Sequence, residues 1–249
     1  MSTRCPPSRL SWGISWSWVD ARTSRIGIER PLYTYDRALQ RGQLRDRLNR
    51  FTLEVAFDGT TEPVYLRNSG GLETTYCEGR TILCAPAVNE DRKTAWDAIA
   101  IEVNDHWVSV DAILPNELVR AAIEADRLPG CSGFTVEEAE PALPNGGRAD
   151  LLLRSPEETP TIVEVKSNTY VQEGISKIPD RPTSRGRRHL RELSELTAEG
   201  AVDCLVVFVI QRPDAQRLSR SGRPIRISPS GLPMLPTPAF GYTPDDTLC

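Results

Sequence analysis

Residues 162–167 read IVEVKS, an apolar strand that carries a carboxylate, Glu164, and an ammonium, Lys166, two positions apart. Charged side chains are rare in such a run unless they are paired or bind a ligand. Because side chains alternate along a strand, Glu164 and Lys166 lie on the same face. We therefore expect one polar patch on this strand.

Residues 148–154, RADLLLR, form a second expected strand, and the turn SPEETP separates the two. A hairpin brings Asp150 to the end of the sheet where Glu164 and Lys166 lie. Asp150 shares their face only if it pairs with one of them, which requires an odd-length loop or a bulge. A slip of one residue would place it on the opposite face. The turn leaves room for a five-residue loop.

Two carboxylates and a lysine on one patch suit Mg²⁺, which proteins usually hold with one or two carboxylates, waters and phosphate oxygens. The metal would activate a water, and Lys166 would orient or deprotonate that water. Glu140, ten residues before Asp150, is a candidate third acid. The pattern D-x(13)-E-x-K resembles the core of PD-(D/E)xK nucleases. By itself the pattern favours a simpler interpretation, an ion pair at the edge of a sheet.

The charge distribution adds to this pattern. Residues 166–191 hold seven lysines and arginines against two acids, whereas the whole chain has a net charge of -4. Cations in the first turn of the helix expected over 184–200 oppose its macrodipole, so their placement favours a bound anion such as a backbone phosphate. A solvated charged face is the alternative. The candidate nucleic-acid-binding residues are Arg181, Arg185, Arg187, Arg188 and Arg191.

The composition narrows the class of protein. Of the 249 residues, 39% are apolar, as in ordinary globular proteins, and no run approaches the roughly 20 apolar residues of a membrane span. The six cysteines form no C-x-x-C pair, so neither a disulfide framework nor a zinc ribbon is expected. We expect a cytoplasmic protein without a membrane partner.

Periodicity divides the chain. Alternation in NRFTLEVAFDG predicts a half-buried strand that stops at Asp58–Gly59, and short strands follow at 62–67, 81–86, 96–103 and 106–111. Residues 115–128 have helical spacing, and 201–214 read as a central strand covered on both sides. The expected segments are an irregular leader (1–43), a small β-barrel (44–112), a helix and linker (113–130), an α/β domain (131–217) and a proline-rich tail (218–249).

Several blocks in this order resemble the sugar fermentation stimulation protein family: NRFTLEVAFDG, GRADLLL, IVEVKS, IPDRPTSRGRRHLRELSEL and LVVFVIQRPDAQR. The resemblance covers roughly residues 44 to 217. It implies an N-terminal OB-like barrel and a C-terminal α/β domain like that of PD-(D/E)xK nucleases. It also implies non-specific DNA binding and regulation of sugar (maltose) metabolism genes, with nuclease-like positions at Glu140, Asp150, Glu164 and Lys166.

Three functions follow as hypotheses. The first is a DNA-binding protein that contacts mainly the phosphate backbone. The second is an Mg²⁺-dependent nuclease in which Asp150 and Glu164 bind the metal, Lys166 positions water and Glu140 assists; Mg²⁺ is expected as a cofactor only in this case. The third is a module that binds a small anionic metabolite, which predicts weak DNA affinity without a steep dependence on salt.

Overall fold

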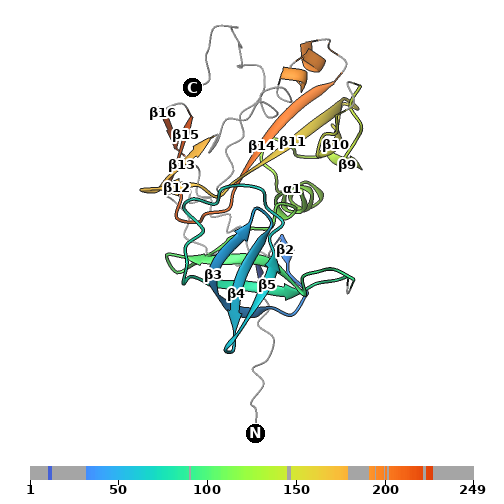
Figure 1. Cartoon of the computed structure of the whole chain (residues 1–249). Coiled ribbons are helices and arrows are strands. Elements are labelled where there is room, and N and C mark those ends of the chain that lie inside the picture. The colour runs from blue at the N-terminus through green and yellow to red at the C-terminus, as the bar shows by residue number, and fades with distance from the viewer. Residues whose placement is uncertain are drawn as a thin grey trace.

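The computed structural model describes residues 11–12, 32–89, 91–144, 147–178, 191–193, 195–198, 200, 202–220 and 223–226. Strands dominate, and one long helix lies between a barrel and a second group of sheets (Figure 1). No helix in these ranges is long and apolar enough to cross a membrane.

The N-terminal domain is a closed barrel. Its strands are β3 (Gln40–Asn49), β4 (Thr52–Phe57), β5 (Thr60–Tyr65), β6 (Thr81–Pro86), β7 (Trp96–Val103) and β8 (His106–Ser109). They pair in the order β5-β4-β3-β6-β7-β8, and a parallel pairing of β5 with β7 closes β3–β7 into a ring. This order is that of the OB-fold, as the sequence predicts. The predicted turn between β4 and β5 is present, with positive φ at Asp58 (44°) and Gly59 (93°).

Strand β3 begins before the predicted barrel boundary at residue 44 and was not expected from the sequence. Its only fully buried side chain is that of Leu44, because the preceding inward position is Gly42. A Cβ atom at Gly42 would lie 2.4 Å from Cγ1 of Val55 and 2.8 Å from Cε1 of Phe57. The barrel interior therefore has no room for a side chain here, and the glycine removes the alternation that identifies a strand.

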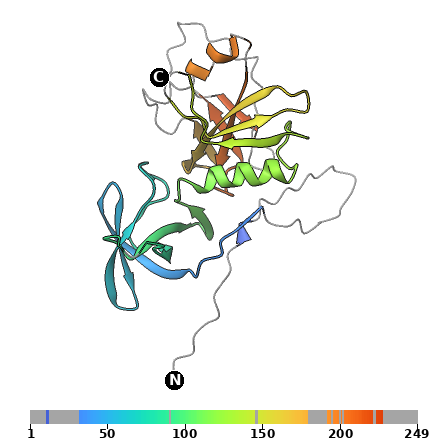
Figure 2. The same cartoon turned by 90° about the vertical axis from the view of Figure 1, so that its right-hand side faces the viewer.

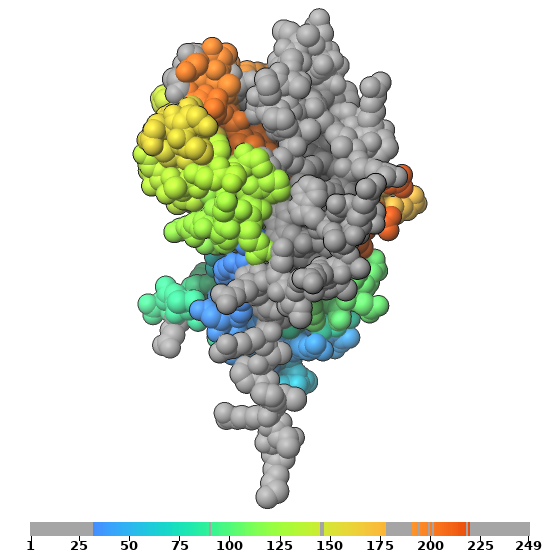
Figure 3. Space-filling model, turned by 180° about the vertical axis from the view of Figure 1, so that it is seen from behind, coloured from blue at the N-terminus to red at the C-terminus, as the bar shows by residue number. Residues whose placement is uncertain are grey.

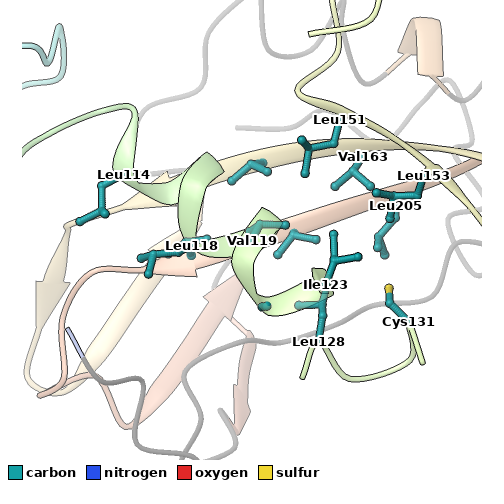
Figure 4. Close-up of a cluster of buried hydrophobic side chains, with 14 residues drawn as sticks. Leu114, Leu118, Val119, Ile123, Leu128, Cys131, Leu151, Leu153, Val163 and Leu205 are labelled. Carbon is teal, nitrogen blue, oxygen red and sulfur yellow. The ribbon is translucent and has the colours of Figure 1, made fainter. Parts of the chain in front are cut away.

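Helix α1 (Leu114–Glu124) confirms the helix predicted at 115–128. It buries one apolar face, made of Leu114, Leu118, Val119, Ala122 and Ile123. This face packs on Leu151, Leu153, Val163 and Leu205 of the adjoining sheet (Figure 4). Each fully buried aliphatic side chain of this kind contributes about 1.5–3 kcal/mol to stability. The rotated view in Figure 2 shows the helix between this sheet and the barrel.

The sheet above α1 has the order β14-β11-β10-β9, with β9 (Thr135–Ala139), β10 (Leu151–Arg154), β11 (Pro160–Asn168) and β14 (Asp203–Ile210). We predicted that residues 201–214 form a central strand. Among the described strands, β14 instead pairs only with β11, in parallel, and so lies at an edge. Its apolar residues on both faces reflect cover above and below the sheet: Val207 packs toward α1, and Cys204 packs on the other side with Leu193.

Four further strands extend the C-terminal domain: β12 (Val171–Gln172), β13 (Ile175–Ile178), β15 (Arg217–Arg220) and β16 (Arg223–Arg226), in the order β12-β13-β15-β16. We expected the chain from residue 218 to be mostly irregular, but β15 and β16 form a hairpin there. Pro224 is compatible with β16 because this strand lies at the edge of its sheet, where a missing N–H breaks no ladder. In the expected leader, β1 (Ser11–Trp12) pairs with β2 (Tyr33–Thr34).

The two domains are joined by a polar clamp built around Arg212, which follows β14. The Arg212 side chain is 3% exposed, and its Nε and Nη2 atoms donate to the two carboxylate oxygens of Asp214 at 2.7 and 2.5 Å. Its remaining Nη1 atom donates to the carbonyl of Thr74, in the barrel, at 3.3 Å. This hydrogen bonding holds the pKa of Asp214 below its usual value. Arg212 thus fixes a barrel turn against the C-terminal domain.

The barrel side of the clamp is the turn at Thr74 and Thr75. Both hydroxyls donate to the carbonyl of Thr169 at 3.3 Å, and the N–H of Val171 donates to Oγ1 of Thr74 at 3.2 Å. Arg80 supports the same turn from within the barrel, through the carbonyls of Thr74 and Thr75. Seen from behind, the surface of the α1 region lies directly above that of the barrel (Figure 3).

We predict that Arg212→Ala lowers the free energy of unfolding by about 2–4 kcal/mol, because it leaves Asp214 without its guanidinium and the Thr74 carbonyl without this donor. Urea unfolding followed by circular dichroism measures the change. Arg120→Ala is the control, since its ion pair with Glu124 is about half exposed, and it should cost less than about 1 kcal/mol. Equal effects of the two substitutions would contradict a special role for Arg212.

Candidate functional site

The hairpin of β10 and β11 has the register that the sequence requires. Arg154 pairs with Pro160 and Leu151 with Val163, so residues 155–159 form a five-residue loop. The ladder ends at Leu151, and just beyond it the Asp150 N–H donates to the carbonyl of Val163 at 3.1 Å. The loop has the odd length that the sequence analysis requires, and it brings the backbone of Asp150 beside Val163 of β11.

The Asp150 carboxylate is held by two donors from different elements. Nδ2 of Asn116, in the first turn of α1, donates to Oδ1 at 2.8 Å, and the backbone N–H of Val165 donates to Oδ2 at 2.6 Å. Because β10 begins only at Leu151, the carboxylate takes the place of a strand partner for Val165. The Asp150 carboxylate is therefore oriented by both α1 and β11.

Glu164 and Lys166 form an ion pair on the face of β11 that points away from α1. Val163 and Val165 pack in the α1 cluster, so alternation turns Glu164 and Lys166 to the opposite side. The Glu164 side chain is 6% exposed and that of Lys166 is 32% exposed. A carboxylate so deeply buried needs a charged or hydrogen-bonded partner, which the lysine provides.

Glu140 lies near Asp150 through its backbone but not through its carboxylate. Its N–H donates to the Asp150 carbonyl at 3.0 Å, while its side chain is 71% exposed and lies 3.7 Å from Nη1 of Arg148. Within the described ranges, no three His, Cys, Asp or Glu side chains form a group that could hold a metal. A cation here would rely on Asp150 and Glu164, and the helper role of Glu140 stays a prediction.

Most of the basic candidates, Arg181, Arg185, Arg187 and Arg188, lie outside the described residues. Arg191 is exposed and begins the described helical residues 191–193 and 195–198. Two residues later, Leu193 packs with Ile162 and Cys204 beneath the sheet. Ile162, Glu164 and Lys166 share one face of β11, so this helix covers the same face as the ion pair.

Asn116 was not singled out from the sequence, although it contacts the site directly. Asn116 is far from Asp150 in the sequence, and only the packing of α1 on β10 and β11 brings these two residues together. An asparagine in the first helical turn has an ordinary capping explanation. No local signal distinguishes the two roles.

Two family models match the chain. The model described as "SfsA N-terminal OB domain" matches residues 46–110, and the one described as "Sugar fermentation stimulation protein RE domain" matches residues 113–223. The boundary between the models falls directly before α1, which begins at Leu114.

Curated relatives show the same similarity. A sugar fermentation stimulation protein homolog of Moorella thermoacetica is 39% identical over 70% of this chain and 74% of its own length. That of Natranaerobius thermophilus is 35% identical over 74% of this chain and 77% of its own length. A solved structure of Pyrococcus furiosus SfsA in complex with Ca²⁺ has a TM-score of 0.67 and 26% identity, and the match covers 74% of this chain and 77% of that one.

The ion pair on β11 gives a test by double substitution. Lys166→Met should cost about 2–4 kcal/mol of unfolding free energy, because it removes the ammonium from a buried carboxylate. Adding Glu164→Gln to this variant should restore about 1 kcal/mol or more, because the buried charge is then gone. Urea unfolding at pH 7 of the two single variants and the double variant measures this coupling.

Lys177→Met is the control, since Lys177 is exposed and its ammonium makes surface contacts, with Oε1 of Gln172 at 3.3 Å and with the Tyr170 ring, whose centroid lies 5.5 Å away. Its effect should stay within about 0.5 kcal/mol. If the costs of the two site substitutions simply add, the ion pair contributes nothing to stability and this description of the site is wrong.

Proposed function

The chain belongs to the sugar fermentation stimulation protein family, and from this premise we propose that it binds DNA, mainly through the phosphate backbone. The observation that carries the proposal is the position of the helix containing Arg191. This helix packs under the face of β11 that holds Glu164 and Lys166. Arg191, the one basic candidate among the described residues, thus lies two residues before the contact on the face with the buried ion pair.

The chemistry of that segment favours an anion with many charges. In the sequence, Arg185, Arg187 and Arg188 lie within six residues before Arg191, at the start of the helix predicted over 184–200. The positive end of a helix dipole disfavours these cations unless an anion neutralises them. A nucleic-acid backbone presents regularly spaced phosphates to such a cluster. The regulation of sugar metabolism genes would rest on this binding, and phosphate contacts alone carry no sequence information.

Salt dependence tests this proposal. On duplex DNA, log K should fall linearly with log salt, and replacing Arg187 and Arg188 together with alanine should reduce the slope by roughly two units. Fluorescence anisotropy across a salt series measures it. Arg120→Ala with Arg154→Ala is the matched control, because it removes the same charge from exposed pairs with glutamates.

The control slope should be unchanged. A reduction as large as that of the Arg187 and Arg188 variant would mean that net charge, not contact, sets the affinity. Weak binding without a steep slope would instead favour the small-anion module.

A second candidate function is Mg²⁺-dependent phosphodiester hydrolysis, and the contact of the Asp150 carboxylate with β11, the strand that carries Glu164, favours it. The donor set fits a hard cation: each Asp150 oxygen accepts one hydrogen bond and keeps a further lone pair, and Glu164 supplies a second carboxylate. The Pyrococcus furiosus relative was solved with Ca²⁺. Asp150 and Glu164 would hold the cation, and Asn116 would keep Asp150 oriented.

In such a reaction a bound Mg²⁺ would lower the pKa of a water and neutralise charge on the phosphodiester. Lys166 can place its ammonium beside the attacked phosphate or accept a proton from the water as a free amine. Both roles require Lys166 to leave the Glu164 carboxylate. Its partial exposure, 32% against 6% for Glu164, gives it room to do so.

Incubation with single- and double-stranded DNA, in Mg²⁺ or in chelator, separates the two functions. If the site is a nuclease, the wild type cleaves DNA in Mg²⁺ only, and Glu164→Ala abolishes cleavage. Glu137→Ala, which removes a 40%-exposed carboxylate from an ion pair on the neighbouring strand, should leave cleavage unchanged. Intact but retarded DNA would exclude the nuclease and support the binding function alone.

A further inference from the structure

The β3–β4 end of the barrel exposes apolar side chains beside arginines. Among the described residues, four large hydrophobic side chains are exposed: Leu48 (51%), Phe51 (44%), Val88 (80%) and Ile113 (45%). Two of these four, Leu48 and Phe51, lie within four residues of one another at one turn. Exposed apolar groups that gather in this way indicate a contact surface more often than isolated ones do.

This turn is held rigidly by Arg47. Its Nη1 atom donates to the carbonyl of Gly71 at 3.0 Å, and its Nη2 atom donates to those of Gly70 and Arg50 at 2.9 and 3.0 Å. The Phe51 N–H donates to Oδ1 of Asn49 at 2.9 Å. These bonds tie down the backbone of the turn at Phe51, so less backbone entropy is lost when a partner binds there.

The charges around Phe51 favour an anionic partner. The Arg50 guanidinium lies 5.4 Å from the Phe51 ring centroid, and Arg45 is exposed on β3. Residues 41–54 contain four arginines and two acids, Asp46 and Glu54, so the local balance is positive. An aromatic ring with an adjacent guanidinium suits a partner that carries both flat rings and phosphates.

The position of the turn in the barrel agrees with this chemistry. Since β3 and β4 are the first two strands of the closed ring, their connection corresponds to one of the loops with which OB-folds bind oligonucleotides. We propose that Phe51, with Arg50 beside it, is a stacking platform for a base of single-stranded nucleic acid. The proposal rests on the DNA-binding function above and specifies a strand with unpaired bases, because the bases of a duplex are already stacked on one another.

Abasic DNA separates base stacking from phosphate contact. Anisotropy in chelator compares a short oligothymidine with an abasic strand of the same length, so that both carry the same phosphates. The wild type should prefer oligothymidine by roughly 5- to 140-fold, which is the range expected for one stacked base. Phe51→Ala should remove this preference, and Phe51→Trp should keep it.

The salt series distinguishes the two side chains. Phe51→Ala removes no charge and should leave the salt slope unchanged, whereas Arg50→Ala should reduce it by about 0.7 on a single strand. Val88→Ala, at an 80%-exposed apolar position on another loop, is the control and should change neither quantity.

Three results would overturn the platform. The first is equal affinity of the wild type for the two strands, and the second is a preference that survives Phe51→Ala. In both cases DNA binding itself would stand if duplex is still retarded. The third is no binding to any DNA, which would overturn the proposed function as well. If Phe51→Ala does not fold, Phe51→Leu, which keeps an apolar side chain without a ring, replaces it and should likewise lose the preference.

Discussion

The buried guanidinium of Arg212 is the constraint on which the arrangement of the two domains depends. It donates to both carboxylate oxygens of Asp214, which neutralises its charge, and it also donates to the Thr74 carbonyl in the barrel. One side chain thus connects the two domains. Burying such a group is costly unless every donor finds a partner of suitable geometry. Together with the bonds of Thr74 and Thr75 to Thr169 and Val171, this group holds the barrel against the C-terminal domain.

The clamp and the candidate site share the same pair of strands. Lys166 pairs with Phe208 and Asn168 with Ile210 in the parallel ladder of β11 and β14. Immediately beyond it, the Gln211 N–H donates to the Asn168 carbonyl at 2.9 Å, one residue before Arg212. The strand that carries the ion pair thus ends at the interdomain contact.

The sequence predicted the parts of this protein that local patterns determine. The alternation in IVEVKS was enough to predict that Glu164 and Lys166 share one face, the turn at 155–159 allowed a five-residue loop, and helical spacing identified the buried face of α1. Strand β3 was missed because Gly42 fills an inward position where the barrel leaves no space. The apolar residues on both faces of β14 indicate that other elements pack on both faces of the sheet. They do not indicate whether a strand pairs with each edge of β14. The contact between Asn116 and Asp150 depends on tertiary packing that no short stretch of sequence encodes.

The ion pair between Glu164 and Lys166 means that the site contains its own counter-ion. A divalent cation that binds Glu164 must compete with the lysine for the same carboxylate, so its binding is an exchange of one cation for another. The displaced ammonium is then available to a phosphate. By the reciprocity of linked equilibria, the cation and the phosphate must raise each other's affinity by the same factor. Such a site would discriminate against either ligand alone and respond to the two together.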